Sequence, residues 1–135
     1  MVDLSDTAGV LPTAGRVTIL IIDDDLAMRM ILSFSLTALG YLVLIAKNGE
    51  EALQVTHDHP EVRLIVLDVV LGGLSGKEVA VQLRSRLPEV SILFCSGHPA
   101  AAMSRHGIDL EIEHFLQKPF GPPELKQKVE ELLST

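Results

Sequence analysis

Short runs of consecutive apolar residues alternate along the chain with longer stretches in which apolar residues return every three or four positions. A continuous apolar run is typical of a strand covered on both faces, because a half-solvated strand would alternate polar and apolar positions. The spaced pattern is typical of a helix that buries one side. The runs predict strands at residues 17–22, 42–46, 64–68, 91–95 and 113–117.

The spaced patterns predict helices at residues 26–39, 49–57 and 77–87, and a last helix that begins at Pro122 or Pro123. Asn48 and Ser75 precede two of these helices and can cap them, and Gly40 ends the first. Residues 98–107 are rich in alanine but have a weak apolar pattern, so we expect a short or frayed element there. The core-facing positions expected in the first helix are Met28, Ile31, Leu32, Ser35, Leu36 and Leu39.

Strands that alternate with helices through short loops predict right-handed crossovers and a parallel sheet with helices on both faces. The expected fold class is therefore α/β, a doubly wound, five-stranded parallel sheet. Residues 1–16 mix Asp, Ser, Thr, Gly and Pro without periodicity, and we expect a flexible leader there. Residues 17–135 are expected to form one domain, because a chain of 135 residues has little room for a second core.

Composition narrows the possible functions. A formal net charge of −7 argues against nucleic-acid binding, which needs clustered Lys and Arg. The single cysteine, Cys95, cannot form an intrachain disulfide, so we expect a reducing compartment, the cytoplasm. The longest apolar runs are the length of a strand, and we expect no membrane-spanning segment.

Reactive side chains stand at the ends of the expected strands. Asp23, Asp24 and Asp25 follow the first strand, and Asp68 ends the third. Carboxylates about 4 Å apart repel by roughly 1 to 4 kcal/mol, and a hard divalent cation such as Mg²⁺ relieves that repulsion. Ser96 and Lys118 follow the fourth and fifth strands and add a hydroxyl and an ammonium. A metal, an ammonium and a hydroxyl donor around Asp68 suit phosphoryl transfer, with the carboxylate as nucleophile.

At this point the chain, over about residues 17–133, resembles the receiver domains of two-component response regulators, which have a flavodoxin-like (βα)5 fold. Singly the motifs are weak, but their order and spacing are highly specific. They are ILIIDDD at residues 19–25, LD at 67–68 with Gly76 eight positions later, FCSG at 94–97 and FLQKPF at 115–120.

The resemblance implies a role for each matching residue. Asp68 is expected to be the phosphoacceptor, and Ser96 and Lys118 to bind the phosphoryl oxygens. Ser96 and Phe115 are expected to act as switch residues. The expected Mg²⁺ ligands are Asp24 directly, Asp23 partly through water, Asp68, and the backbone carbonyl of Val70.

The same resemblance implies the partners. The phosphodonor is expected to be a sensor histidine kinase or a histidine phosphotransfer protein. The output partner is unknown, the chain is expected to be a monomer or weak dimer, and no enzymatic activity is expected. The expected output surface consists of the fourth helical segment, the fifth strand and the last helix.

Two departures from the family pattern concern the loop after Asp68. The family usually has Met-Pro where this chain has Leu71-Gly72, so we expect a more mobile loop. The second position after the phosphoacceptor is often polar in the family, and Val70 there removes a side chain that could orient water.

A free receiver has four alternatives. The receiver end of a hybrid sensor histidine kinase fits the same motifs. A Mg-dependent phosphatase of the haloacid dehalogenase type needs a general-acid Asp two residues after the nucleophile, and Val70 cannot serve. A flavodoxin-like cofactor binder would place a phosphate against three repelling aspartates. A degenerate receiver that only docks partners is at odds with the intact set of Asp23, Asp24, Asp68, Ser96 and Lys118.

Ala27, Met30 and Phe34 form a second apolar line on the first helix, outside the expected core stripe. The line is as consistent with packing against neighbouring loops as with a surface for the phosphodonor protein. Both interpretations stay open at this point.

Overall fold

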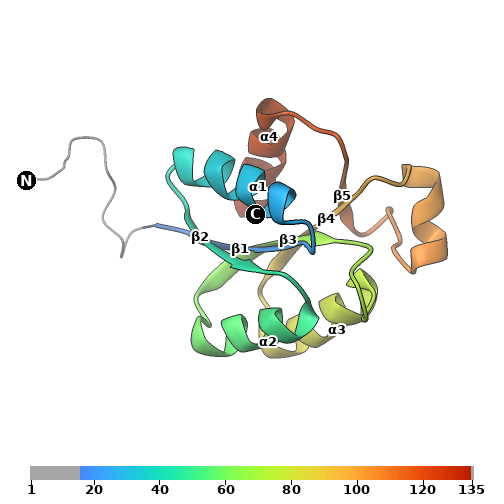
Figure 1. The fold of residues 1–135 in the computed structure, drawn as a ribbon, viewed down its shortest axis with the longest axis horizontal. Helices are drawn as coiled ribbons and strands as arrows, with labels where there is room; N and C mark the ends of the chain where they lie inside the picture. The colour runs from blue at the N-terminus through green and yellow to red at the C-terminus, as the bar shows by residue number, and fades with distance from the viewer. Residues whose placement is uncertain (1–15, 135) are drawn as a thin grey trace, which may run out of the picture.

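The computed structural model describes residues 16–134, in which five strands alternate with five helical segments (Figure 1). The expected leader, residues 1–16, lies outside this range except for Arg16. None of the helices within residues 16–134 is long and apolar enough to cross a membrane. In chain order the elements are β1 (Thr18–Ile22), α1 (Leu26–Ala38), β2 (Leu42–Ala46), α2 (Gly49–Asp58), β3 (Val62–Asp68), α3 (Gly76–Arg86), β4 (Ser91–Ser96), η2 (Ala100–His106), β5 (His114–Gln117) and α4 (Pro122–Leu133).

The five strands form one parallel sheet in the order β2-β1-β3-β4-β5. Helices α1 and α4 cover one face, and α2 and α3 cover the other (Figure 1). Each face has its own buried apolar cluster, because successive residues of a strand point to opposite faces. The predicted doubly wound α/β fold is confirmed, and β3 at its centre carries Asp68.

Strand β3 begins earlier than the apolar run predicted, at Val62 instead of residue 64. Val62 is buried and pairs with Thr18 of β1, whereas Arg63 between the two apolar positions is exposed. The sheet register shifts between Thr18 and Ile19, which accommodates this extra residue. Because the polar Arg63 interrupts the apolar residues, the sequence pattern predicted a start of the strand two residues too late.

Helix α1 buries a narrower face than its sequence predicts. Leu32 and Leu36 are buried, but Ile31 is 62% exposed and Leu39 is 39% exposed, so the prediction that these two face the core was wrong. Because α1 lies over β1 and the edge strand β2, no further element in the described range, residues 16–134, covers a second row of its residues. The row formed by Ala27, Met30 and Phe34 is exposed.

The predicted helix caps are confirmed, and the observed bounds of α1, α2 and α3 differ from the predicted ones by one residue. The Asn48 side chain accepts a hydrogen bond from the Glu51 N–H, and Ser75 and Glu78 form a reciprocal capping box at α3. Gly40 follows α1 with a positive φ of 99°, which favours glycine. Pro122 and Pro123 occupy the first turn of α4, where a missing N–H costs nothing.

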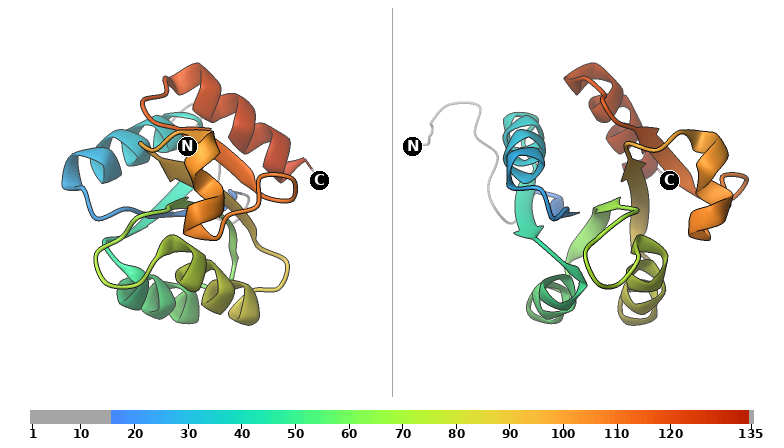
Figure 2. Two further views of the ribbon diagram at one scale, coloured as in Figure 1. Left: turned by 90° about the vertical axis from the view of Figure 1, so that its right-hand side faces the viewer. Right: turned by 45° about the vertical axis from the view of Figure 1, so that its right-hand side comes forward.

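The segment after β4 is a seven-residue 3₁₀ helix, η2, which matches the expected short element. It buries only Ala102 and Met103 and has no side-chain hydrogen bond at its N-terminus. Figure 2 shows η2, in orange, standing beyond the β5 side of the sheet instead of lying over a face. The opposite edge strand, β2, is apolar throughout, and its Ile45 is 51% exposed.

Candidate functional site

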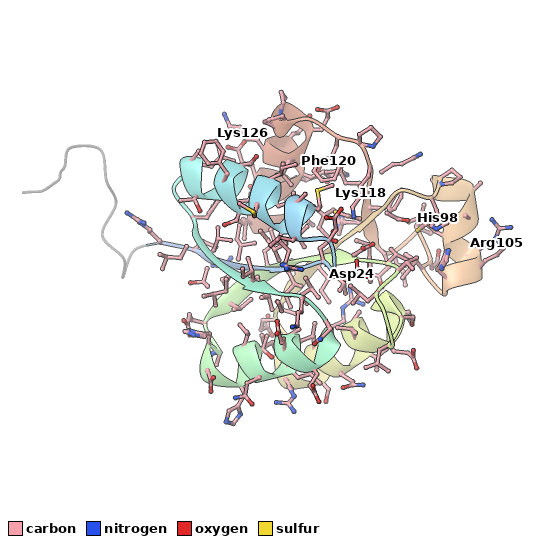
Figure 3. All side chains as sticks on the ribbon, viewed as in Figure 1. Asp24, His98, Arg105, Lys118, Phe120 and Lys126 are labelled. Atoms are coloured by element: carbon pink, nitrogen blue, oxygen red, sulfur yellow. The ribbon has the colours of Figure 1, made fainter. Side chains whose placement is uncertain are left out.

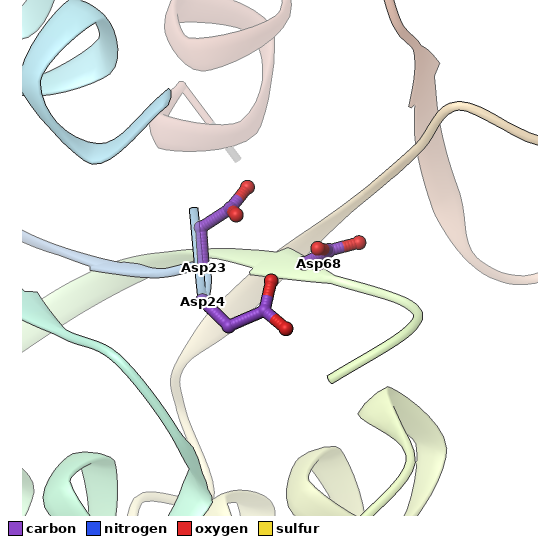
Figure 4. Close-up of side chains that lie close together, drawn as sticks. All are labelled: Asp23, Asp24 and Asp68. Carbon is purple, nitrogen blue, oxygen red and sulfur yellow. The ribbon is translucent and has the colours of Figure 1, made fainter. Parts of the chain in front are cut away.

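Three carboxylates meet where β1 and β3 end. Asp23 and Asp24 directly follow β1, and Asp68 is the last residue of β3. The neighbouring parallel strands pair Ile22 with Leu67, so the residues after these partners lie side by side. One oxygen from each carboxylate lies within 4.8 Å of the others, and Figure 4 shows the three groups gathered in one place. Such an oxygen-only set suits a hard cation such as Mg²⁺.

Asp23 is buried, and its backbone and its carboxylate both form hydrogen bonds. Its N–H donates to the Ala46 carbonyl at 3.2 Å, and its carboxylate accepts from the Asp25 N–H at 2.9 Å. The Lys118 ammonium donates to its other oxygen at 2.8 Å, and Arg29 donates to its backbone carbonyl at 2.7 Å. Burial of this carboxylate is thus offset by hydrogen bonds and a paired charge.

Asp24 and Asp25 have different surroundings from Asp23. Both are exposed, and the Asp25 side chain caps α1 by accepting from the Ala27 N–H at 3.0 Å. Within residues 16–134, no hydrogen bond or ion pair holds the Asp24 carboxylate. Gly72, in the loop after β3, is its neighbour, since an added Cβ would lie 4.0 Å from Asp24 Oδ2. Asp24 is therefore free to take a new ligand.

Asp68 is buried beside Lys118. Its Oδ1 accepts from the Val70 N–H at 3.2 Å, and its Oδ2 lies 3.6 Å from the Lys118 ammonium. Burial raises the pKa of Asp68 to about 6, and the repulsion from Asp23 and Asp24 adds to it, while Lys118 acts in the opposite direction. A positive charge placed among the three carboxylates would keep Asp68 ionised.

Ser96, the last residue of β4, and Lys118, which directly follows β5, complete the site. The backbone N–H of Lys118 donates to the Ser96 carbonyl at 2.8 Å. Burial works against the Lys118 charge, but the hydrogen bond to Asp23 and the nearby Asp68 outweigh it and raise its pKa. The buried Ser96 hydroxyl accepts from the His98 N–H at 2.9 Å. Figure 3 shows Lys118 and Asp24 on the same side of the molecule, with His98 on the segment that leads to η2.

The other predicted site residues, Val70 and Phe115, lie around this centre. Val70 directs its N–H to Asp68, and its side chain is exposed. Phe115, in β5, is partly buried against the apolar cluster on the α2 and α3 side of the sheet. The roles expected for the Val70 carbonyl and for Phe115 as a switch stay predictions.

Gly76 lies against the main chain at the end of β3. Its N–H donates to the Val69 carbonyl at 2.8 Å, and an added Cβ would lie 2.6 Å from the Asp68 carbonyl oxygen. No side chain fits there, so this glycine allows α3 to begin directly behind Asp68. The sequence pointed to Gly76 by its spacing alone and gave no physical reason for it.

The sequence favoured metal binding over a helix cap for Asp23 to Asp25 as a group and did not single out Asp25 as the cap, and it missed the contact of Arg29 with Asp23. The cap had a signal, because Asp directly before a helix is a preferred N-cap residue. The Arg29 contact had none, since it joins a side chain to a backbone carbonyl six residues earlier. Cys95 is buried in β4, and burial raises the pKa of its thiol to about 12, so it is inert.

The model of the response regulator receiver domain family matches residues 19–130. The chain belongs to this family. Receiver domains are known for binding Mg²⁺ at an acidic cluster, and the Asp23, Asp24 and Asp68 group fits that description.

Named relatives agree with the family. The response regulator MprA of Mycolicibacterium vanbaalenii is 38% identical over 118 residues, which are 87% of this chain and 50% of that protein. The probable transcriptional regulator ycf27 of Cyanophora paradoxa is 35% identical over 116 residues, 85% of this chain and 47% of that protein. The chain thus spans about half the length of these curated relatives.

Solved receiver structures have the same fold. A response regulator receiver protein from Sinorhizobium medicae gives a TM-score of 0.79 at 28% identity, covering 90% of this chain and 98% of that one. The response regulator TrrA from Thermotoga maritima, solved in complex with Mg²⁺-BeF, gives 0.74 at 30% identity, covering 86% and 98%. The flavodoxin-like fold expected from the resemblance is therefore confirmed.

Proposed function

We propose that this receiver domain accepts a phosphoryl group on Asp68 from a sensor histidine kinase or a histidine phosphotransfer protein, with Mg²⁺ bound. The proposal rests on the charged groups that surround the Asp68 carboxylate. It lies 3.6 Å from the Lys118 ammonium and within 4.8 Å of the other two carboxylates. Mg²⁺ would be held by Asp23, Asp24, Asp68 and the Val70 carbonyl, and it would neutralise charge on the incoming phosphoryl group.

In the transfer, an Asp68 oxygen attacks the phosphorus of the phosphohistidine. The new O–P bond forms as the N–P bond breaks, and the electron pair of that bond stays on the imidazole nitrogen, which takes up a proton. Asp68 must be ionised to attack. Lys118 and the Ser96 hydroxyl then donate to the phosphoryl oxygens, since the ammonium has further N–H groups beside the one bound to Asp23 and the hydroxyl, which accepts from the His98 N–H, still has its own proton to donate.

A small-donor experiment tests the central claim. Wild-type protein and Asp68→Asn are incubated with acetyl phosphate and Mg²⁺, and aspartyl phosphate is measured by intact mass. The wild type should gain one phosphoryl group, and Asp68→Asn none. Beryllofluoride binding in the presence of Mg²⁺ should follow the same pattern. Equal labelling or equal beryllofluoride binding by the two proteins would reject the proposal.

The proposed switch couples this site to the surface formed by η2, β5 and α4. Ser96 ends β4 immediately before the loop to η2, and Lys118 follows β5. A phosphoryl group on Asp68 would give both side chains a new hydrogen-bond partner. Hydrogen exchange in residues 98–107 should therefore change on phosphorylation, and Ser96→Ala and Lys118→Ala should reduce the change. Unaltered protection in a fully phosphorylated wild type would contradict this coupling.

The proposed docking surface for the phosphodonor protein is the exposed side of α1. Leu26, Met30, Phe34 and Ile45 line a hollow of about 410 Å³ that runs along α1 from its first residue, near the site. Phe34 is 79% exposed, although aromatic rings are usually covered. A donor histidine must reach Asp68, so its protein has to rest on the surfaces around the strand ends, where α1 begins.

Phe34→Ala tests this docking surface. Truncating a central aromatic of an interface typically costs about 2 kcal/mol or more, so transfer from the cognate kinase should slow by about 30-fold or more. Labelling by acetyl phosphate should be nearly unchanged. Ile112→Ala is a matched control, since Ile112 is 74% exposed but precedes β5 at the other edge of the sheet. If both variants slow transfer from the kinase equally, or if Phe34→Ala does not slow it, the docking surface is not the exposed side of α1.

A further inference from the structure

Arg29 makes a contact with the cation site that the expected family roles do not include. The residue is half-buried in the first turns of α1, and its Nη1 donates to the backbone carbonyl of Asp23 at 2.7 Å. That carbonyl belongs to the peptide group that joins Asp23 to Asp24. We propose that Arg29 is a positioning residue, which orients the Asp24 carboxylate for Mg²⁺ by holding this peptide group. The inference rests on the proposed Mg²⁺ site.

The reason lies in how differently the two aspartates are held. The Asp23 carboxylate has two partners, the Asp25 N–H and Lys118. The Asp24 carboxylate is exposed and has no hydrogen bond to any residue in the described range. Its direction therefore depends on the backbone of the turn, and the Arg29 contact is the side-chain bond that fixes the carbonyl of that backbone.

Helix α1 places Arg29 for this contact. Asp25 caps the helix, and the Arg29 N–H donates to the Asp25 carbonyl at 3.0 Å. Arg29 is thus bonded twice to the turn that follows β1, through its backbone N–H to Asp25 and through its guanidinium to Asp23. Arg29 also lines the hollow on α1 with Met30 and Phe34, so the residue that orients the turn borders the proposed docking surface.

The charge of Arg29 by itself would change the Mg²⁺ affinity in the opposite direction from positioning. The Arg29 guanidinium is a positive charge near a cation site, so its removal should tighten Mg²⁺ binding by Coulomb's law. Positioning predicts that the same removal weakens binding, because Asp24 loses its orientation. The sign of the change therefore separates the two effects.

Mg²⁺ affinity is measured by titration of backbone amide chemical shifts in the wild type, Arg29→Gln, Arg29→Lys and Arg63→Gln. Loss of groups that orient metal ligands typically costs about 10- to 100-fold in affinity. We expect Arg29→Gln near the lower end, about tenfold weaker, and Arg29→Lys between it and the wild type. Arg63→Gln removes the same charge from an exposed position in β3 and should bind Mg²⁺ as the wild type does.

Wild-type or tighter binding by Arg29→Gln would overturn the inference. If Arg29→Gln does not fold, Arg29→Lys carries the test with the charge unchanged, and wild-type affinity in that variant would overturn it. A double-mutant cycle adds a second test: in an Asp24→Asn background, Arg29→Gln should cause little further loss, and an additive loss would contradict action through Asp24. Absence of Mg²⁺ binding in the wild type would instead reject the proposed function, and this inference with it.

Discussion

The helical segments that follow β3 and β4 differ, although both strands end at the same site. After β3, α3 has eleven residues, a reciprocal capping box and a buried face formed by Val79, Ala80 and Leu83. After β4, η2 has seven residues in a 3₁₀ helix, lacks a side-chain cap and buries only Ala102 and Met103. The Asp68 side of the site is thus anchored by a packed helix, and the Ser96 side by a short, weakly held one.

This difference indicates where the domain can change shape. Segments with few buried contacts open at a lower free energy than the packed core. A signal that begins at Asp68 should therefore be expressed in η2 and the segment before β5, while β3 and α3 keep the carboxylates in place. A fixed site and a movable neighbour are the two parts that a switch needs.

The sharpest test of the comparison is a pair of glycine substitutions, one after each strand. In Gly76→Ala the new Cβ would lie 2.6 Å from the Asp68 carbonyl oxygen, so α3 or β3 must shift. We expect about 3 kcal/mol less stability, at the upper end for overpacking, measured by urea unfolding. Gly97→Ala meets nothing within 4 Å and should change stability by less than about 0.5 kcal/mol. Equal losses would mean that the two sides are equally tight.

A smaller effect is expected from the ion pair that ties α3 to the segment before β5. Arg84 donates to both oxygens of Glu113, at 2.9 and 2.6 Å. The Glu113 side chain is only 10% exposed, so Arg84→Met leaves a largely buried carboxylate unpaired and should cost about 2 kcal/mol. Hydrogen exchange in residues 107–113 should also quicken.

The control for this ion pair is Lys128→Met, which removes the partner of Glu131 in a pair at 3.8 Å whose side chains are 33% and 52% exposed. Exposed pairs contribute at most about 1 kcal/mol. A loss in Lys128→Met as large as in Arg84→Met would show that the buried carboxylate is not the cause.

The stability of the Asp68 side of the site should depend on pH. The pKa of Asp68 is raised to about 6 from an unfolded value of 3.8, so the folded state binds more protons between these values. The contribution of Asp68 to stability therefore falls as pH rises through this window. Asp68→Asn removes that contribution and should become more stable relative to the wild type from pH 4 to pH 7. Urea unfolding across this range, without Mg²⁺, measures the difference, and a constant difference would contradict the raised pKa.

Strand positions and the residues that form the site were accessible from sequence because buried parallel strands appear as continuous apolar runs. The groups at their carboxyl ends must converge, as Asp23, Asp68, Ser96 and Lys118 do. Which helix positions face solvent was less accessible. Ile31 follows helical periodicity, but its exposure depends on α1 lying at an edge of the sheet, which periodicity does not encode.

Contacts between side chains and backbone were also beyond the sequence pattern. The Arg29 contact depends on the path of the turn after β1, and the 3₁₀ geometry of η2 depends on how few of its residues are covered. Gly76 was noticed for its spacing, but the steric reason required the position of the Asp68 carbonyl. In each case the missing information is a tertiary distance.

The edge strand β2 has a consequence for how the protein behaves when concentrated. Its five residues, LVLIA, include neither a charge nor a proline, the features that usually keep an edge strand from pairing with another chain. Within residues 16–134 no strand pairs with the outer side of β2, so its outer backbone groups there are a template for a sixth strand, next to the apolar hollow on α1. Near the sequence pI of about 5.1 the net charge that keeps molecules apart disappears, and this edge is where we expect aggregation to start.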